Sequence, residues 1–249
     1  MKYPFLKLRY YQSLLRDLLQ FIRKPSQLML LSKSTKFKIY DTIGLFILKM
    51  VFLIPLILFF ALVYDPKNQT GASMADRFSP LILLLVGGLI LPVLEEVCFR
   101  LSLRFKPVYL ALSSGVLLYY ILTKAVYHTK ISAIDDTFMM RMLPAMMFSF
   151  ILLSIFNLKK VKARLAMFWR IHFRTIYYLS CVLFAAVHVF KYELTWLNIA
   201  LLPLLTLPQL MSALIYGYTR ISFGFQYPLL FHMSTNLLAI GISLLPFTD

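Results

Sequence analysis

The 249-residue chain is 60% hydrophobic, only 14% of its residues are charged, and its mean hydropathy is +0.77. A soluble domain is nearer about 45–50% apolar, so the composition excludes an ordinary soluble fold and predicts an integral membrane protein. The net charge of +16 does not indicate nucleic-acid binding, because lysine and arginine gather between the apolar runs, as they do in the cytoplasmic loops of membrane proteins. Cys98 and Cys181 both lie in apolar segments and predict no disulfide framework.

Residues 1–41 predict a basic, amphipathic cytoplasmic segment that precedes the membrane domain. They contain neither the apolar stretch nor the small-residue cleavage site of a signal peptide. Apolar residues recur at helical spacing, basic residues occupy polar positions, and Pro25 ends the pattern: Leu14, Leu15, Leu18, Leu19 and Ile22 form the apolar set, and Arg16, Arg23 and Lys24 belong to the basic set. Such a helix is expected either to lie on an anionic cytoplasmic leaflet or to pack on the cytoplasmic face of the bundle.

Residues 42–249 predict an all-α, polytopic transmembrane helical bundle. Since a membrane-spanning helix needs roughly 20 apolar residues, we expect about seven spans. Their approximate bounds are Ile43–Val63, Pro80–Phe105, Val108–Leu122, Met142–Leu158, Ile176–Phe190, Trp196–Tyr218 and Pro228–Pro246.

The charges between these spans predict an orientation. Basic residues crowd the N-terminal tail and the loop that runs from Lys159 to Arg174, whereas the alternate loops are close to neutral. Because lysine and arginine favour cytoplasmic loops, the N-terminus is expected in the cytoplasm and the C-terminus outside. The basic, aromatic-rich composition favours a bacterial cytoplasmic membrane, and the oligomeric state stays open.

The second predicted span ends in the motif Glu95-Glu96-Val97-Cys98-Phe99-Arg100. Adjacent carboxylates at such a depth are costly and indicate a functional site. On a helix Glu96 and Arg100 share a face and can pair, whereas Glu95 is rotated by about 100° and has no such cation. We therefore expect Glu95 to act as a general base for water and the Glu96–Arg100 pair to support it. A purely structural ion-pair cluster is the alternative.

Two later apolar segments carry histidines at helical spacing. Phe184 and His188 share one face, and a histidine on such a face is often only a core residue. His232 and Asn236 also share a face, and two convergent donors on one rigid helix suit an oxyanion hole, or else a hydrogen-bonded contact between helices. Cys98 is a conceivable thiol nucleophile but is expected to be a packing residue.

A metal site is not predicted. Glu95, His188 and His232 could form a two-histidine, one-carboxylate zinc site. The chain lacks a His-Glu-x-x-His element, so it carries no specific metal signal. No cofactor is expected, and zinc stays open.

These motifs, taken together and in this order, resemble the CAAX protease and bacteriocin-processing family, also called the Abi family. The family pattern is Glu-Glu-x-x-x-Arg, then Phe-x-x-x-His, then His-x-x-x-Asn or Asp. It is matched here by Glu95, Glu96 and Arg100, by Phe184 and His188, and by His232 and Asn236. The resemblance covers a protease-like core at about residues 80–245. The link between the first two motifs is longer than is common, which indicates an inserted helix pair.

The resemblance, in particular to the type II CAAX prenyl endopeptidases, implies an intramembrane glutamate protease that needs no metal. Glu95 and His188 would activate water, and His232 and Asn236 would stabilise the oxyanion. Glu96 and Arg100 would hold the site. The substrate would be a membrane-associated or lipid-modified peptide or protein. A catalytically silent scaffold or bacteriocin-immunity protein that binds a partner peptide is the alternative, and a proton-coupled transporter is a third hypothesis.

One expectation is at odds with this site. His188 falls near the outside end of its predicted span, just before Lys191 and Glu193, whereas Glu95 falls nearer the cytoplasmic side. For the two side chains to meet, their helices must be shifted, bent or incomplete, which membranes allow around a polar cavity.

Overall fold

The computed structural model describes residues 4–27, 33–64, 66, 68–193 and 195–245. All regular elements in these residues are helices, which confirms the predicted all-α class. Within the N-terminal segment, residues 1–3 and 28–32 lie outside the described part of the chain, as does Pro246 at the predicted end of the last span.

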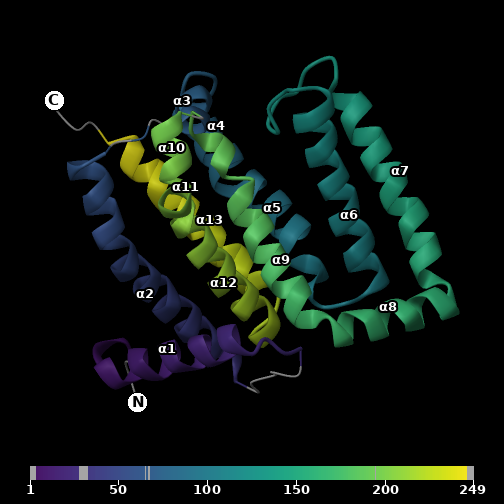
Figure 1. Cartoon of the computed structure of the whole chain (residues 1–249), viewed down its shortest axis with the longest axis horizontal. Coiled ribbons are helices and arrows are strands. Elements are labelled where there is room, and N and C mark those ends of the chain that lie inside the picture. The colour runs from purple at the N-terminus through teal and green to yellow at the C-terminus, as the bar shows by residue number, and fades with distance from the viewer. Residues whose placement is uncertain (1–3, 28–32, 65, 67, 194, 246–249) are drawn as a thin grey trace.

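The helices follow one another through the chain as labelled in Figure 1. The first half contains η1 (Pro4–Leu6), α1 (Leu8–Arg23), α2 (Thr35–Leu62), α3 (Gln69–Ala75), α4 (Pro80–Leu85), the π-helix η2 (Val86–Ile90), α5 (Leu91–Phe99), η3 (Leu101–Leu103) and α6 (Pro107–Ile121). The second half contains the π-helix η4 (Leu122–Val126), α7 (Phe138–Asn157), α8 (Lys159–Ile171), α9 (Phe173–Ala186), η5 (Val189–Lys191), α10 (Trp196–Ala200), α11 (Leu202–Leu205), α12 (Leu207–Ser222) and α13 (Gln226–Ser243).

Five helical stretches among the described residues are long and apolar enough to cross a bilayer, which supports a membrane protein. They are Thr35–Phe60, Pro80–Leu103, Pro107–Val126, Phe138–Asn157 and Phe173–Lys191. Each overlaps one of the first five predicted spans. Most of their side chains face outward, as expected where lipid rather than water is the surrounding solvent.

The last two predicted spans have a different form. The segment predicted at Trp196–Tyr218 is divided into α10, α11 and α12, and prolines lie in the first turns of α11 and α12. A proline has no backbone N–H to donate and so favours the start of a new helix. The segment predicted at Pro228–Pro246 corresponds to α13, which carries the polar side chains of His232 and Asn236. The count of seven spans stays a prediction.

Two helices lie across the same end of the bundle, as Figure 1 shows for α1 and α8. Helix α1 buries Leu14, Leu18 and Phe21, and the Phe21 ring lies 5.2 Å from Tyr177 and 5.3 Å from Tyr218. This packing attaches α1 to the bundle. Its predicted contact with an anionic leaflet stays a prediction.

Helix α12 is the most deeply buried element in the described part of the chain, with every residue from Ala213 to Ser222 buried or nearly so. It packs closely on α9 at Gly217, where a Cβ would lie 2.5 Å from Cε2 of Tyr177. The Tyr177 ring is itself fixed, because it is fully buried and its hydroxyl donates to the Leu214 carbonyl at 2.9 Å. The absence of a side chain at Gly217 therefore sets the distance between the two helices.

A Gly217→Ala substitution should lower the free energy of unfolding by about 1–3 kcal/mol, because the added methyl overpacks a fixed contact. Gly241→Ala is the matched control, since a Cβ there meets no atom within 4 Å and alanine has the higher helix propensity. Thermal unfolding in detergent measures both. Equal midpoints for the two variants would contradict the close approach of α9 and α12.

Candidate active site

The predicted site residues converge from three helices. Glu95 and Glu96 lie on α5 with Arg100 at its C-terminal cap, His188 follows the end of α9, and His232 lies on α13. The side chains of Glu96 and Arg100 are fully buried, and those of His188 and His232 are nearly so. Glu95 keeps 18% of its side chain exposed. The structure therefore brings together groups that are more than 90 positions apart in the sequence.

The C-terminal end of α5 is held by side chains from neighbouring helices. Ser180 on α9 donates to the Phe99 carbonyl at 2.5 Å. Arg220 on α12 donates to the carbonyls of Arg100 and Leu101, at 3.1 and 2.9 Å. The last carbonyls of a helix have no partner within it, so these contacts both satisfy them and fix where α5 ends.

Glu96 is the central acceptor of the site. Its Oε1 lies 2.9 Å from Nδ1 of His232 and 3.6 Å from a guanidinium nitrogen of Arg100. The predicted i,i+4 pair of Glu96 with Arg100 is therefore present. His232, for which the sequence predicted an oxyanion role, is a further partner of Glu96. A buried carboxylate needs such partners, because desolvation makes an unpaired charge costly.

Arg100 lies against an aromatic ring rather than in a network of hydrogen bonds. Its guanidinium carbon is 3.8 Å from the centre of the Phe184 ring, a cation–π contact. The same ring lies 4.6 Å from the imidazole of His188 and 5.8 Å from that of His232. The Phe184 ring therefore contacts the Arg100 guanidinium and also lies near both imidazole rings. Phe184, which the sequence predicted as a support residue, thus has a defined position in the site.

Glu95 faces both histidines and forms hydrogen bonds to neither. Its Oε2 lies 3.8 Å from Nε2 of His188 and 3.6 Å from Nε2 of His232, both beyond a direct hydrogen bond. The same oxygen is buried and has no hydrogen-bond partner among the described residues. Oε2 of Glu96 likewise has no hydrogen-bond partner there, but the Glu95 oxygen is the one placed between the Nε2 atoms of the two histidines.

The hydrogen bonds of the histidines fix where their protons lie. Nδ1 of His188 is 2.7 Å from the Phe184 carbonyl, and a carbonyl only accepts, so this nitrogen carries hydrogen. An ionised Glu96 likewise accepts from Nδ1 of His232. In the neutral rings Nε2 is then a bare acceptor. Two imidazole lone pairs and one carboxylate oxygen face one another, an arrangement that calls for a proton-bearing ligand between them.

Asn236 forms a hydrogen bond to the helix that leads into α5. Its amide nitrogen donates to the Gly87 carbonyl at 3.0 Å, within the π-helix η2. Widened turns of this kind leave backbone groups without their usual partners and occur often at functional sites. Asn236 therefore joins α13 to the helix that leads into α5. It has a second amide hydrogen, and its predicted oxyanion role stays a prediction.

The helices that carry Glu95 and His188 both depart from regular α-helix near these residues. The span that leads to Glu95 contains the π-helix η2, and α9 ends at Ala186, so that His188 lies on the following turn. Neither motif is part of one uninterrupted spanning α-helix, as the sequence required.

Two residues beside the site were missed by sequence reasoning. Lys49 on α2 is buried, and its Nζ lies 3.1 Å from Oγ1 of Thr235 and 3.4 Å from the hydroxyl of Tyr216. The Tyr216 ring stacks on His232 with centres 5.1 Å apart. A lone lysine within the apolar run of the first span was the available signal, because buried charges in membranes mark functional sites.

The remaining candidates take no part in this cluster of contacts. Cys98 is buried among core residues as a free thiol. No group of three or more His, Cys, Asp or Glu side chains in the described ranges is placed to hold a metal ion. His128 and His172 are exposed and lie away from the site.

Comparisons with known proteins identify no relative of this chain. No family model, no curated protein and no solved structure matches the chain. The case for its function therefore rests on its own residues.

The two glutamates should differ in their effect on stability. Glu96→Gln removes the charge that faces Arg100 and His232, and should lower the free energy of unfolding by about 3–5 kcal/mol, the range for breaking a buried pair. Glu95→Gln should change it by less than about 1 kcal/mol, because its Oε2 has no partner to lose. Unfolding of both variants in mixed detergent measures this. Equal losses would contradict the separate supporting role of Glu96.

Proposed function

We propose that this protein is an intramembrane endopeptidase that hydrolyses a peptide bond with water activated by Glu95. The observation that supports this most strongly is the free Glu95 oxygen, which faces Nε2 of both His188 and His232 at 3.6–3.8 Å. A water molecule has two hydrogens to donate and a lone pair to attack with. It can donate to Glu95 and to one of the two imidazole nitrogens, which makes it the simplest ligand for this group of acceptors.

In the proposed reaction Glu95 removes one proton from this water, and the bare Nε2 of His188 accepts the hydrogen bond from the other. The water oxygen bonds to the carbonyl carbon of the peptide, which becomes tetrahedral with a negatively charged oxygen. When the C–N bond breaks, Glu95 returns its proton to the leaving nitrogen, so that one water is consumed and a carboxylic acid and an amine are formed. A carboxylate positioned in this way acts as base and then as acid.

The negative oxygen needs donors, and the site offers two. His232 can donate from Nε2 when a proton taken up from the medium has first added to that nitrogen, with Nδ1–H still directed to Glu96. His188 is then the one histidine that accepts from the water. Asn236 can donate its second amide hydrogen while the first remains on the Gly87 carbonyl. Donors fixed in advance at a developing negative charge are typically the largest single contribution to such reactions.

The substrate we propose is a membrane-associated or lipid-modified peptide, in line with the resemblance to the CAAX protease and bacteriocin-processing family. We also propose a multi-pass bacterial membrane location with the N-terminus in the cytoplasm. The ends of the bundle support this orientation: the basic helices α1 and α8 lie at the same end in Figure 1, and basic segments favour the cytoplasmic side.

Glu95→Gln and His188→Ala should each reduce peptide cleavage by at least about 100-fold, the lower range for losing a general base. The assay uses purified protein in detergent with a library of lipidated and plain peptides, with and without a chelator. Glu193→Gln and His172→Ala are the matched controls, because both side chains are exposed. They should cleave at the wild-type rate.

Full activity in Glu95→Gln would refute the glutamate mechanism. Loss of wild-type activity with chelator would instead assign the three converging groups to a metal. Full cellular function in Glu95→Gln, with no cleavage of any peptide by the wild type, would favour a partner-binding scaffold.

A further inference from the structure

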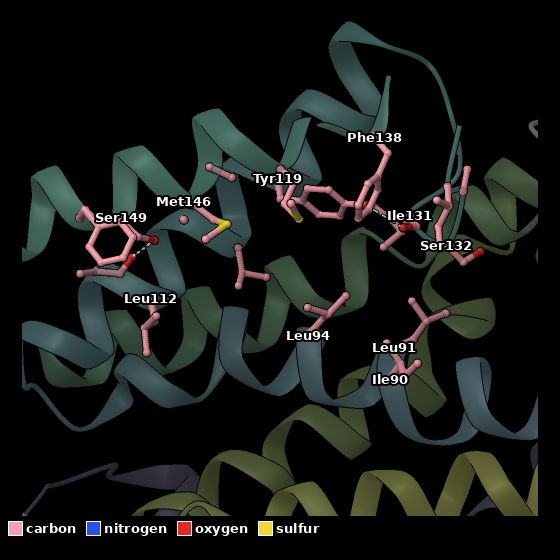
Figure 2. A pocket seen from close by; sticks show the side chains of 18 of the residues that line it. Ile90, Leu91, Leu94, Leu112, Tyr119, Ile131, Ser132, Phe138, Met146 and Ser149 are labelled. Carbon is pink, nitrogen blue, oxygen red and sulfur yellow. Dashed lines mark hydrogen bonds between the residues drawn. The ribbon is translucent and has the colours of Figure 1, made fainter. Parts of the chain in front are cut away.

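An apolar cavity of about 550 Å³ lies outside the candidate active site, between the α5 helix and the pair formed by α6 and α7. Figure 2 shows Ile90, Leu91 and Leu94 on one side of it and Leu112 and Met146 on the other. Its walls are almost entirely apolar. Ligand sites in proteins fall in the range of about 300–1,000 Å³, so the cavity is large enough for one hydrocarbon chain or more.

One end of this cavity is covered by the loop between α6 and α7. Ile131, Ser132, Ala133 and Ile134 line it there, beside Phe138 (Figure 2). The loop is fixed by Arg141, which donates to the Ala133 carbonyl at 2.9 Å and to the Asp135 carboxylate at 3.0 Å.

The anchor of this loop is insensitive to ordinary changes in pH. Hydrogen bonds from the Thr137 hydroxyl, followed by those from Thr129 and the Thr137 amide and by the charge of Arg141, lower the pKa of Asp135 to about 2. Asp135 therefore stays ionised and keeps its ion pair with Arg141 throughout the neutral range.

The other end of the cavity is basic. Val108 and Leu153 line the apolar cavity and also a second one of about 460 Å³, so the two are adjacent. The second cavity is lined by Lys106 from the N-terminal cap of α6 and by Lys162 from α8. Both lysines are exposed, and no ion pair joins either to a carboxylate within the described ranges.

The dimensions of the two cavities suit one kind of molecule. The part of α6 from Val108 to Tyr119, which lines the apolar cavity, is about 17 Å long at a helical rise of about 1.5 Å per residue. The hydrocarbon of one leaflet is about 15 Å deep, half of the usual bilayer core of about 30 Å. An acyl chain in the cavity would thus carry its headgroup to the level of Lys106 and Lys162.

We propose that this pair of cavities is a binding site for an anionic phospholipid of the surrounding bilayer, with an acyl chain along α6 and the phosphate between Lys106 and Lys162. The charge decides between lipid classes. Basic pockets at the ends of membrane helices bind anionic headgroups, and the N-terminus of α6 adds backbone N–H groups with the same preference. A zwitterionic headgroup carries its own cation and gains less from two lysines that no carboxylate in the described part of the chain neutralises, although Nζ of Lys106 also lies 4.9 Å from the centre of the Tyr109 ring.

Native mass spectrometry of the full chain tests this site with phosphatidylglycerol and phosphatidylcholine of identical acyl chains. The wild type should retain phosphatidylglycerol preferentially. Lys106→Gln combined with Lys162→Gln should weaken that binding about 25-fold, since each lysine beside an anionic headgroup contributes a factor of roughly five. Lys159→Gln combined with Lys160→Gln is the control, because these lysines lie on the same helix and line neither cavity.

A second variant tests the acyl chain separately. Val108→Trp places a large ring where the two cavities meet and should reduce the binding of phosphatidylglycerol while both lysines remain. Three outcomes would overturn the proposal: equal retention of the two lipids, equal losses in the two lysine double variants, or unchanged binding in Val108→Trp. Displacement of phosphatidylglycerol by a lipidated peptide without an anionic group would assign the cavity to a substrate chain instead. None of these readouts requires peptidase activity, so their failure is distinct from failure of the proposed function.

Discussion

The buried Glu96 carboxylate is the contact on which the rest of the site depends. It accepts from His232 on α13 and faces the guanidinium of Arg100 at the end of α5, so one oxygen joins two helices far apart in the sequence. Charges removed from water are costly, and a single partner seldom offsets that cost. Here the cation also lies on the face of Phe184, which brings α9 into the same arrangement. With Oε1 of Glu96 occupied in this way, Oε2 of Glu95 is the carboxylate oxygen that faces both histidines.

The different surroundings of the adjacent residues Glu95 and Glu96 follow from helix geometry. Successive residues on a helix point about 100° apart, so one side chain can be enclosed by its partners while its neighbour faces a different space. Glu96 lies among ion-pair and hydrogen-bond partners, and Glu95 opens toward two imidazole nitrogens. The hydrogen bonds made by Nδ1 of each histidine leave Nε2 directed at Glu95. The reactive arrangement proposed here is therefore a consequence of contacts that also hold the helices together.

Much of the fold was predictable because it follows from local patterns in the sequence. The apolar runs predicted about seven spans, and five of these overlap the described helices that are long and apolar enough to cross a membrane. The i,i+4 spacing indicated the Glu96–Arg100 pair. The set Glu95, His188 and His232 was expected to converge, and the structure brings these three side chains together, while their catalytic roles stay predictions. The difficulty over depth was also visible in advance, since the charges beside His188 placed it near a helix end.

The remaining features depend on contacts that no local pattern encodes. The π-helix at Val86–Ile90 is stabilised by Asn236, which lies 149 positions away. The sequence did not predict that the sixth span is divided into shorter helices. A proline can either kink a helix or begin a new one, and the local pattern does not distinguish the two. Lys49 was overlooked because its partners, Tyr216 and Thr235, come from helices near the other end of the chain. Such pairings are set by the folded bundle rather than by spacing.

The most direct test of this account is the protonation of the two site histidines, observed by ¹⁵N NMR in detergent with labelled histidine. The chain has four histidines, so His128→Gln and His172→Gln remove the two exposed ones and leave the signals of His188 and His232. The account predicts a hydrogen on Nδ1 of both rings, donated to the Phe184 carbonyl and to Glu96, with Nε2 directed at Glu95. An unprotonated Nδ1 on either ring would contradict the arrangement of acceptors on which the proposed water activation rests.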